Sequence, residues 1–262
     1  MATLTCYSAN YYYASYPIAS GDVADVIAAI RTELKTRNNP AWTEPSGNLF
    51  KSPVDASGRF LDMLFTRIDQ QTLEMRVRDQ LARTICTRRI QSGTAAFLIN
   101  IYSGQFHFIV DIIASTGTNS TLYAGILDQT PDAQAAQPVY VYGGGSLSSA
   151  NSADGSSSAS RSFMYDYGGA GYQDRTPIFG SSTNQACLYT QNGSKIYKPV
   201  ENLLNTAASV FKVAGRRYQQ LICTSDLYQL ARVTVPLDNM SGLFQVTCIA
   251  SANGMRIACR IG

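Results

Sequence analysis

The spacing of apolar residues predicts one amphipathic helix near the N-terminus. In the stretch SGDVADVIAAIRTELKTRNNP, residues 20–40, apolar side chains recur every three or four positions and therefore fall on one side of an α-helix. Asp22 is placed to cap the first turn, and Asn-Asn-Pro ends the helix. The apolar stripe predicts that this helix docks on a sheet. The apolar stripe consists of Val23, Val26, Ile27, Ile30 and Leu34.

Most of the remaining pattern alternates between apolar and polar residues, which is typical of β-strands. Residues 72–80, TLEMRVRDQ, place Leu73, Met75 and Val77 on one face and charged residues on the other. Residues 94–113 predict a hairpin that turns at Ser-Gly-Gln, and Asn192-Gly193 predicts another. Residues 41–53, which include Trp42, are interpreted as an irregular link. Further strands are expected at 59–68, 121–129, 138–144, 216–225, 227–237, 242–251 and 255–262.

These patterns predict a mainly β protein, with an antiparallel, sandwich-like sheet architecture and the one N-terminal helix packed on it. A run of glycine, serine and alanine, GGGSLSSANSADGSSSASRS at residues 143–162, interrupts the strands. Such a composition favours a long surface loop or a linker. We therefore divide the chain into a helix-plus-β region at 1–142, a Gly/Ser/Tyr-rich loop or linker at 143–176, and C-terminal hairpins at 177–262. The last region is expected to belong to the same domain or to pack closely against it.

The composition limits the classes of partner. Charged residues make up only 15% of the 262 residues and the net charge is +3, so no strong nucleic-acid signal is present. The most basic stretch, RTICTRR, is interpreted as a strand whose arginines Arg83, Arg88 and Arg89 face solvent. No segment has the pattern of a signal peptide or of a transmembrane span.

Candidate catalytic chemistry centres on His107, the only histidine in the chain. The six cysteines form no CxxC pair, so we expect no metal site and no cofactor. Free buried thiols are favoured over three disulfides. A cysteine-dependent hydrolase would pair His107 with Cys86, whose arginine neighbours favour a thiolate. A histidine held within a sheet is the favoured interpretation, and we expect no enzymatic activity.

The sixteen tyrosines predict protein–protein contacts, because tyrosine offers a large and rigid amphipathic surface. One group lies near the N-terminus. A second group stands beside glycines and is expected in loops. The candidate interface residues are Tyr11, Tyr12, Tyr13, Tyr142, Tyr165, Tyr167 and Tyr172.

The order of several segments resembles a group of tailed-bacteriophage virion proteins. The segments are GDVADVIAAIRTEL, NNPAWTEPSGNLFKSP, RFLDMLF, LEMRVRDQ, FLINIYSGQFHFIVDI, VYVYGGGS and ARVTVPLDNMSGLFQVTCIA. The resemblance implies a structural subunit of the tail, baseplate or neck, or of the capsid surface, assembled in the host cytoplasm with other virion proteins and with copies of itself. It covers much of the chain and carries no catalytic residues. The high cysteine count departs from the pattern.

Two other function classes remain open beside this one. A capsid decoration protein would also act by assembly. A secreted or surface-displayed module that binds a glycan or a host receptor through loop tyrosines would be expected to contain three disulfides.

Overall fold

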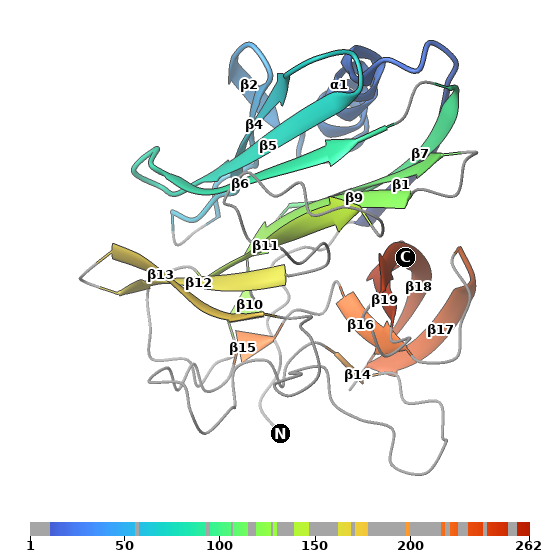
Figure 1. The fold of residues 1–262 in the computed structure, drawn as a ribbon. Helices are drawn as coiled ribbons and strands as arrows, with labels where there is room; N and C mark the ends of the chain where they lie inside the picture. The colour runs from blue at the N-terminus through green and yellow to red at the C-terminus, as the bar shows by residue number, and fades with distance from the viewer. Residues whose placement is uncertain are drawn as a thin grey trace.

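Antiparallel β-sheets stacked in layers form most of the fold. The computed structural model describes residues 11–55, 58–92, 95–105, 107–114, 119–126, 128–129, 139–146, 162–168, 171–177, 198–199, 216–217, 221–224, 230–237, 240–250 and 256–262. Within these residues the protein is mainly β, with a single α-helix near the N-terminus, as the sequence pattern predicts. A five-stranded sheet and the helix cover one side of a central seven-stranded sheet, and a C-terminal sheet lies on its other side (Figure 1).

The central sheet has the strand order β1-β7-β8-β9-β11-β12-β13. The hairpin predicted at residues 94–113 is confirmed, because Phe97 pairs with Ala114 and Ser103 with Phe108. The N-terminal strand pairs with β7, so residue 11 lies opposite residue 104. The strands are β1 Tyr11–Ile18, β7 Phe97–Gly104, β8 His107–Ala114, β9 Asn119–Ile126, β11 Val139–Ser146, β12 Ser162–Gly168 and β13 Gly171–Pro177.

The five-stranded sheet follows chain order, β2-β3-β4-β5-β6. Its first hairpin corrects the interpretation of residues 41–53 as an irregular link. Trp42, within that segment, is buried, and its indole N–H donates to the Gly104 carbonyl. The strands are β2 Thr43–Ser46, β3 Leu49–Lys51, β4 Asp62–Arg67, β5 Thr72–Arg78 and β6 Thr84–Gln91.

The C-terminal sheet has the order β14-β16-β19-β18-β17. Its last strand ends two residues before Gly262, whose carbonyl accepts a hydrogen bond from the Leu243 N–H. Gly262 is thus hydrogen-bonded to the C-terminal sheet. A short pair, β10 Asp128–Gln129 with β15 Arg216–Arg217, stands apart. The other strands are β14 Lys198–Pro199, β16 Leu221–Thr224, β17 Arg232–Leu237, β18 Met240–Ala250 and β19 Arg256–Arg260.

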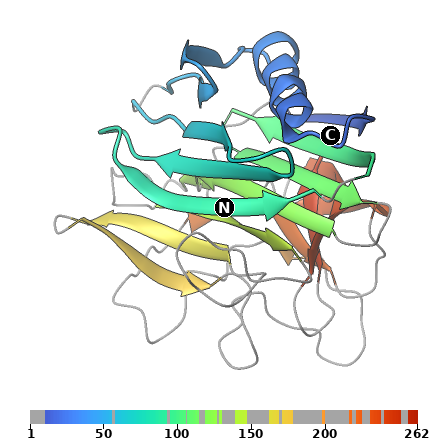
Figure 2. The same cartoon turned by 45° about the horizontal axis from the view of Figure 1, so that its top comes forward.

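The predicted helix is α1, Val23–Thr32, which continues into a π-helical turn, η1, at Glu33–Arg37. The Asp22 carboxylate accepts from the Ala24 N–H and caps the first turn. The apolar stripe faces the sheets, because Val23, Val26, Ile27 and Ile30 are all buried. Turning the molecule shows α1 lying beside the five-stranded sheet on the same side of the central sheet (Figure 2).

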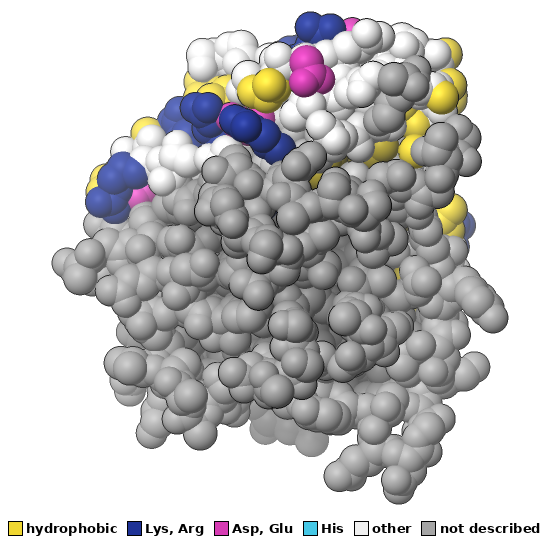
Figure 3. All heavy atoms as spheres, viewed as in Figure 1, with side chains coloured by type: hydrophobic (Ala, Val, Ile, Leu, Met, Phe, Trp, Pro, Cys, Tyr) yellow, Lys and Arg dark blue, Asp and Glu magenta, His cyan; other side chains and the backbone are white. Residues whose placement is uncertain are grey.

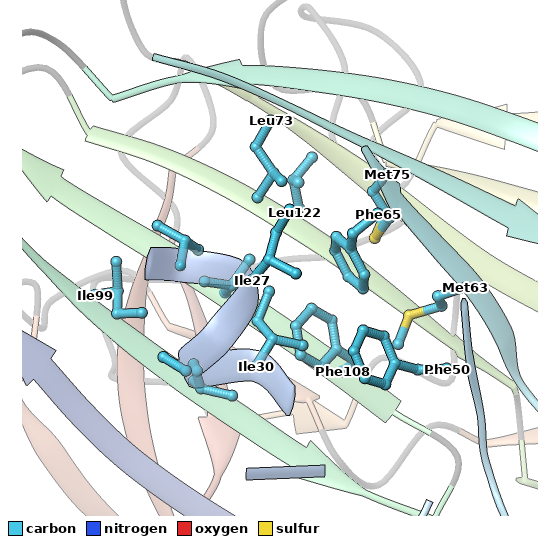
Figure 4. Close-up of a cluster of buried hydrophobic side chains, with 14 of the residues drawn as sticks. Ile27, Ile30, Phe50, Met63, Phe65, Leu73, Met75, Ile99, Phe108 and Leu122 are labelled. Atoms are coloured by element: carbon cyan, nitrogen blue, oxygen red, sulfur yellow. The ribbon is translucent and has the colours of Figure 1, made fainter. Parts of the chain in front are cut away.

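The largest apolar core fills the space between α1, the five-stranded sheet and the central sheet. Ile27 and Ile30 of α1 point toward Phe108 of β8 and Leu122 of β9, and Phe65 of β4 closes the cluster (Figure 4). The rings of Phe65 and Phe108 meet edge to face, with centroids 5.4 Å apart. Burial of these side chains is the main stabilising contribution on this side of the central sheet.

Two loops at the end of the five-stranded sheet have the same pattern of hydrogen bonds between an aspartate and an arginine. In each, an aspartate accepts from the backbone N–H and the Nε of the arginine four residues on, Asp55 with Arg59 and Asp79 with Arg83. The residue before each arginine has a positive φ, 78° at Gly58 and 62° at Ala82. The loops touch where the Gln80 side-chain amide donates to the Gly58 carbonyl.

The glycine- and serine-rich region is partly strand. Strands β11, β12 and β13 take in residues 143–146, 162–168 and 171–177. Tyr142, Tyr165, Tyr167 and Tyr172 therefore lie in strands, and their expected placement in loops is wrong. Residues 147–161 and the predicted Asn192-Gly193 turn lie outside the described residues, and the division into regions at 142 and 176 stays a prediction.

Candidate functional site

The strongest concentration of functional side chains is a buried polar layer on the second face of the central sheet. Side chains alternate along β8, so Phe108, Val110 and Ile112 face the apolar core, whereas His107 and Asp111 face the opposite side. Both of these polar residues are fully buried. The polar layer, as we use the term, comprises Tyr11, Tyr13, Asn100, Tyr102, His107, Asp111, Thr121, Tyr123, Gln245, Cys259 and Arg260.

Strand register aligns the members that come from the central sheet. Asn100, Asp111 and Thr121 lie opposite one another across β7, β8 and β9. The Thr121 hydroxyl donates to the Asp111 carboxylate at 2.6 Å, and the Tyr13 hydroxyl donates to Asn100 Oδ1 at 3.0 Å. These bonds satisfy polar groups that would otherwise cost free energy when buried.

The C-terminal sheet completes the layer from the other side. Gln245 Nε2 donates to the Tyr102 hydroxyl at 3.0 Å, and Arg260 Nη1 donates to the Tyr11 hydroxyl at 3.1 Å. The Arg260 guanidinium also lies 4.2 Å from the Tyr11 ring centroid, which is a cation–π contact. The first and last strands of the chain are therefore joined through this layer.

Burial sets the protonation state of the titratable members. It lowers the pKa of His107 to about 3, with a further lowering from the positive charge of Arg260. Burial, followed by the charge of Asp111, raises the pKa of the Cys259 thiol and that of the Tyr102 hydroxyl. At neutral pH the imidazole, the thiol and the phenol are all uncharged.

These uncharged states do not favour nucleophilic chemistry. A cysteine nucleophile needs a lowered thiol pKa and access for a substrate, whereas Cys259 has a raised pKa and no exposed surface. Cys86 lies in β6 of the five-stranded sheet, which covers the face of the central sheet opposite to His107. The structure thus does not bring the strand of Cys86 to the face that carries His107.

The predicted interface tyrosines lie in the edge strand β1 and, on the other side of the central sheet, in its last three strands. Tyr11, Tyr12 and Tyr13 are half-buried in β1 at one edge. On the other side, the edge strand β13 carries Tyr172, which lies opposite Tyr167 of β12. Tyr165 also lies in β12, and Tyr142 lies in β11, the third strand from this edge.

The RTICTRR segment does not form a single basic patch. Arg88 is buried, which corrects its expected exposure, because adjacent positions in a strand face opposite sides and Arg89 takes the outer one. Arg89 and Arg76 both bind the buried Glu74 carboxylate, and Arg83 binds Asp79. Lysine and arginine side chains still gather over the outer face of this sheet (Figure 3).

Sequence reasoning missed Tyr102, Gln245 and Arg260 as members of the polar layer. A signal was present for the first, since Asn100 and Tyr102 alternate with Ile99 and Ile101 along β7. Nothing in the sequence indicates that β18 and β19 lie against that face.

The Tyr102–Gln245 bond provides a test of the layer's contribution to stability. Tyr102→Phe removes the acceptor of a buried amide N–H, and we expect the free energy of unfolding to fall by about 1–3 kcal/mol. Tyr12→Phe is the matched control, because its hydroxyl binds the exposed backbone of Asn39 and its loss is expected to cost less than about 0.5 kcal/mol. Urea denaturation of both variants measures the difference, and equal effects would contradict the assignment.

Comparison with known proteins adds no family assignment. No protein-family model matches the chain, and no curated protein matches its sequence. No helix in the described ranges has the length and apolar character needed to cross a membrane.

Proposed function

We propose that this protein is a non-enzymatic structural subunit of a tailed-bacteriophage virion, in the tail, baseplate or neck, and that it acts by protein–protein assembly. The segment resemblance that runs from the N-terminal helix to the last strands supports this role. The alternative is a capsid decoration protein, which would also act through protein–protein contacts.

The observation that carries the proposal is that both edge strands of the central sheet contain tyrosines, Tyr11–Tyr13 in β1 and Tyr172 in β13. Among the described strands, β1 pairs only with β7 and β13 pairs only with β12, so each has one backbone edge without a strand partner. Such edges are templates for pairing with another chain. Pro17, which has no N–H, limits this pairing at the end of β1.

The cysteines weigh against a secreted module with three disulfides. Cys259 is a free, buried thiol. With one of the six cysteines free, the chain can form at most two disulfides. The structure does not describe the thiol groups of the other five cysteines.

A charged edge provides the test of assembly. Ser15 is exposed near the middle of β1, so Ser15→Lys adds a charge to the edge without burying it. If assembly uses this edge, we expect the association constant to fall about tenfold or more, which corresponds to about 1.4 kcal/mol. Native mass spectrometry or light scattering over a range of concentrations measures the constant.

Ala28→Lys is the matched control, because Ala28 is exposed on α1 and the added charge is the same. We expect this variant to assemble like the wild type. A wild-type chain that remains monomeric at every concentration and binds no other virion protein would contradict the proposed function. Equal losses in the two variants would contradict the use of the β1 edge.

A further inference from the structure

The central and C-terminal sheets have separate apolar cores. The larger core draws on α1, the five-stranded sheet and the central sheet. The smaller one consists of Phe244, Val246 and Ala258, with Ala231 and Val233 packed beside them, all in or next to the C-terminal sheet. The two share no residue. In the part of the chain that the structure describes, the polar layer lies between the two sheets, together with Ile109, which is buried on the same face of β8.

His107 lies within this junction. It has no exposed surface, and neither ring nitrogen has a hydrogen-bonding partner among the described residues. Its ring lies 5.7 Å from the Tyr11 ring, centroid to centroid, and Arg260 of β19 binds that same tyrosine. A proton on the imidazole would therefore be buried beside a like charge.

No other titratable group described in the layer places a negative charge close to His107 that would stabilise a protonated imidazole. Asp111 lies four residues along β8, about 13 Å away at 3.3 Å per residue, and its carboxylate binds Thr121. β17 contributes a second cation, Arg232, 5.6 Å from the Tyr13 ring centroid. Residues 242–247 of β18 contribute no titratable side chain. Tyr102 and Cys259 stay uncharged, because burial raises the pKa of each.

We propose that His107 is an acid-sensitive latch: its protonation releases the C-terminal sheet from the central sheet, while the larger apolar core stays folded. Release exposes the imidazole to water and separates it from Arg260. This inference does not rest on the proposed assembly function.

The difference in His107 pKa between the docked and released forms determines how pH changes their ratio. The pKa of His107 is about 3 when the sheets are docked and returns toward 6.5 when the imidazole is exposed. The released form therefore binds more protons between these values. The ratio of docked to released protein is constant above pH 6.5 and falls by up to tenfold per pH unit below it, until the pH reaches about 3.

The wild-type chain allows a direct test, because its single histidine gives one imidazole signal in NMR spectra of protein without a histidine tag. Hydrogen exchange is followed in parallel in β18 and in β8. We expect the protection factor of β18, which corrects for the lower intrinsic exchange rate at low pH, to fall as the pH drops from 6.5 to 4. The protection factor of β8 is expected to stay high, and the imidazole to become protonated over the same range. An imidazole that titrates near pH 6.5 while β18 stays protected would overturn the proposal.

His107→Phe and His107→Gln remove the titration while keeping a buried side chain at this position. Either variant, if folded, is expected to keep β18 protected at pH values where the wild type has released it. Release at the wild-type pH in a folded variant would assign the effect to carboxylates and overturn the proposal. If neither variant folds, the wild-type titration decides.

Discussion

Replacing Phe108 with alanine is expected to lower the free energy of unfolding by about 3–5 kcal/mol. Phe108 is fully buried in β8, and its ring packs against Phe65, which in turn packs against Phe50 at 6.0 Å between centroids. The truncation leaves a cavity where α1, the five-stranded sheet and the central sheet meet (Figure 4). These elements are held by the close-packed core, so little relaxation can fill the space.

Denaturation in guanidinium chloride, followed by tryptophan fluorescence, measures this loss, because the only tryptophan, Trp42, is buried in the same core. Leu81→Ala is the control. Leu81 is 63% exposed in the loop between β5 and β6, and its truncation is expected to change stability by less than about 0.5 kcal/mol. A loss below about 1 kcal/mol for Phe108→Ala would contradict the assignment of this residue to the main core.

The second large effect is expected from Asp55→Ala, which should cost about 3–5 kcal/mol. The Asp55 carboxylate lies 2.7 Å from Arg59 Nη2, and the two side chains are only 6% and 1% exposed. Removing the carboxylate leaves the guanidinium charge in a buried position with its closest counter-charge gone. Thermal and chemical denaturation at pH 7 measure the loss.

Asp79→Ala is the matched control, because the loop of Asp79 has the same pattern of aspartate–arginine hydrogen bonds. Its partner Arg83 is at the same 2.7 Å, but half of the Arg83 side chain is exposed to water. Solvent can therefore take over the solvation of that charge, and we expect a loss of about 1–2 kcal/mol from the broken loop hydrogen bonds. Equal losses in the two variants would mean that burial of the arginine does not set the cost.

Hydrophobic periodicity correctly predicted the elements that have one apolar and one polar face. The stripe on α1 and the alternation in β5 correctly placed Val26, Ile27, Leu73 and Met75 in the core. In β5 even the outer Glu74 is buried, because two arginines cover it. That burial depends on neighbouring strands, which the pattern of one strand does not contain.

The sequence was less informative where elements are short or covered on both sides. Strands β2 and β3 have four and three residues, too few for a period to emerge. Arg88 was expected at the surface because arginine is mostly exposed, and alternation with Arg89 overrode that preference. The polar layer itself arises from pairing between distant segments, as in the bond between Gln245 and Tyr102, and local patterns do not report such pairing.

The two faces of the central sheet are completed at different times when the chain is synthesised from its N-terminus. The cover of the apolar face, α1 and strands β2 to β6, is made before β7, β8 and β9 leave the ribosome. The cover of the other face, β17 to β19, is made last. The face that is covered last carries one buried aliphatic side chain from β8, Ile109, and beside it His107, Asp111 and Tyr102, which water can solvate. A nascent chain is therefore less prone to aggregate than one that exposes Phe108 and Val110 for the same interval.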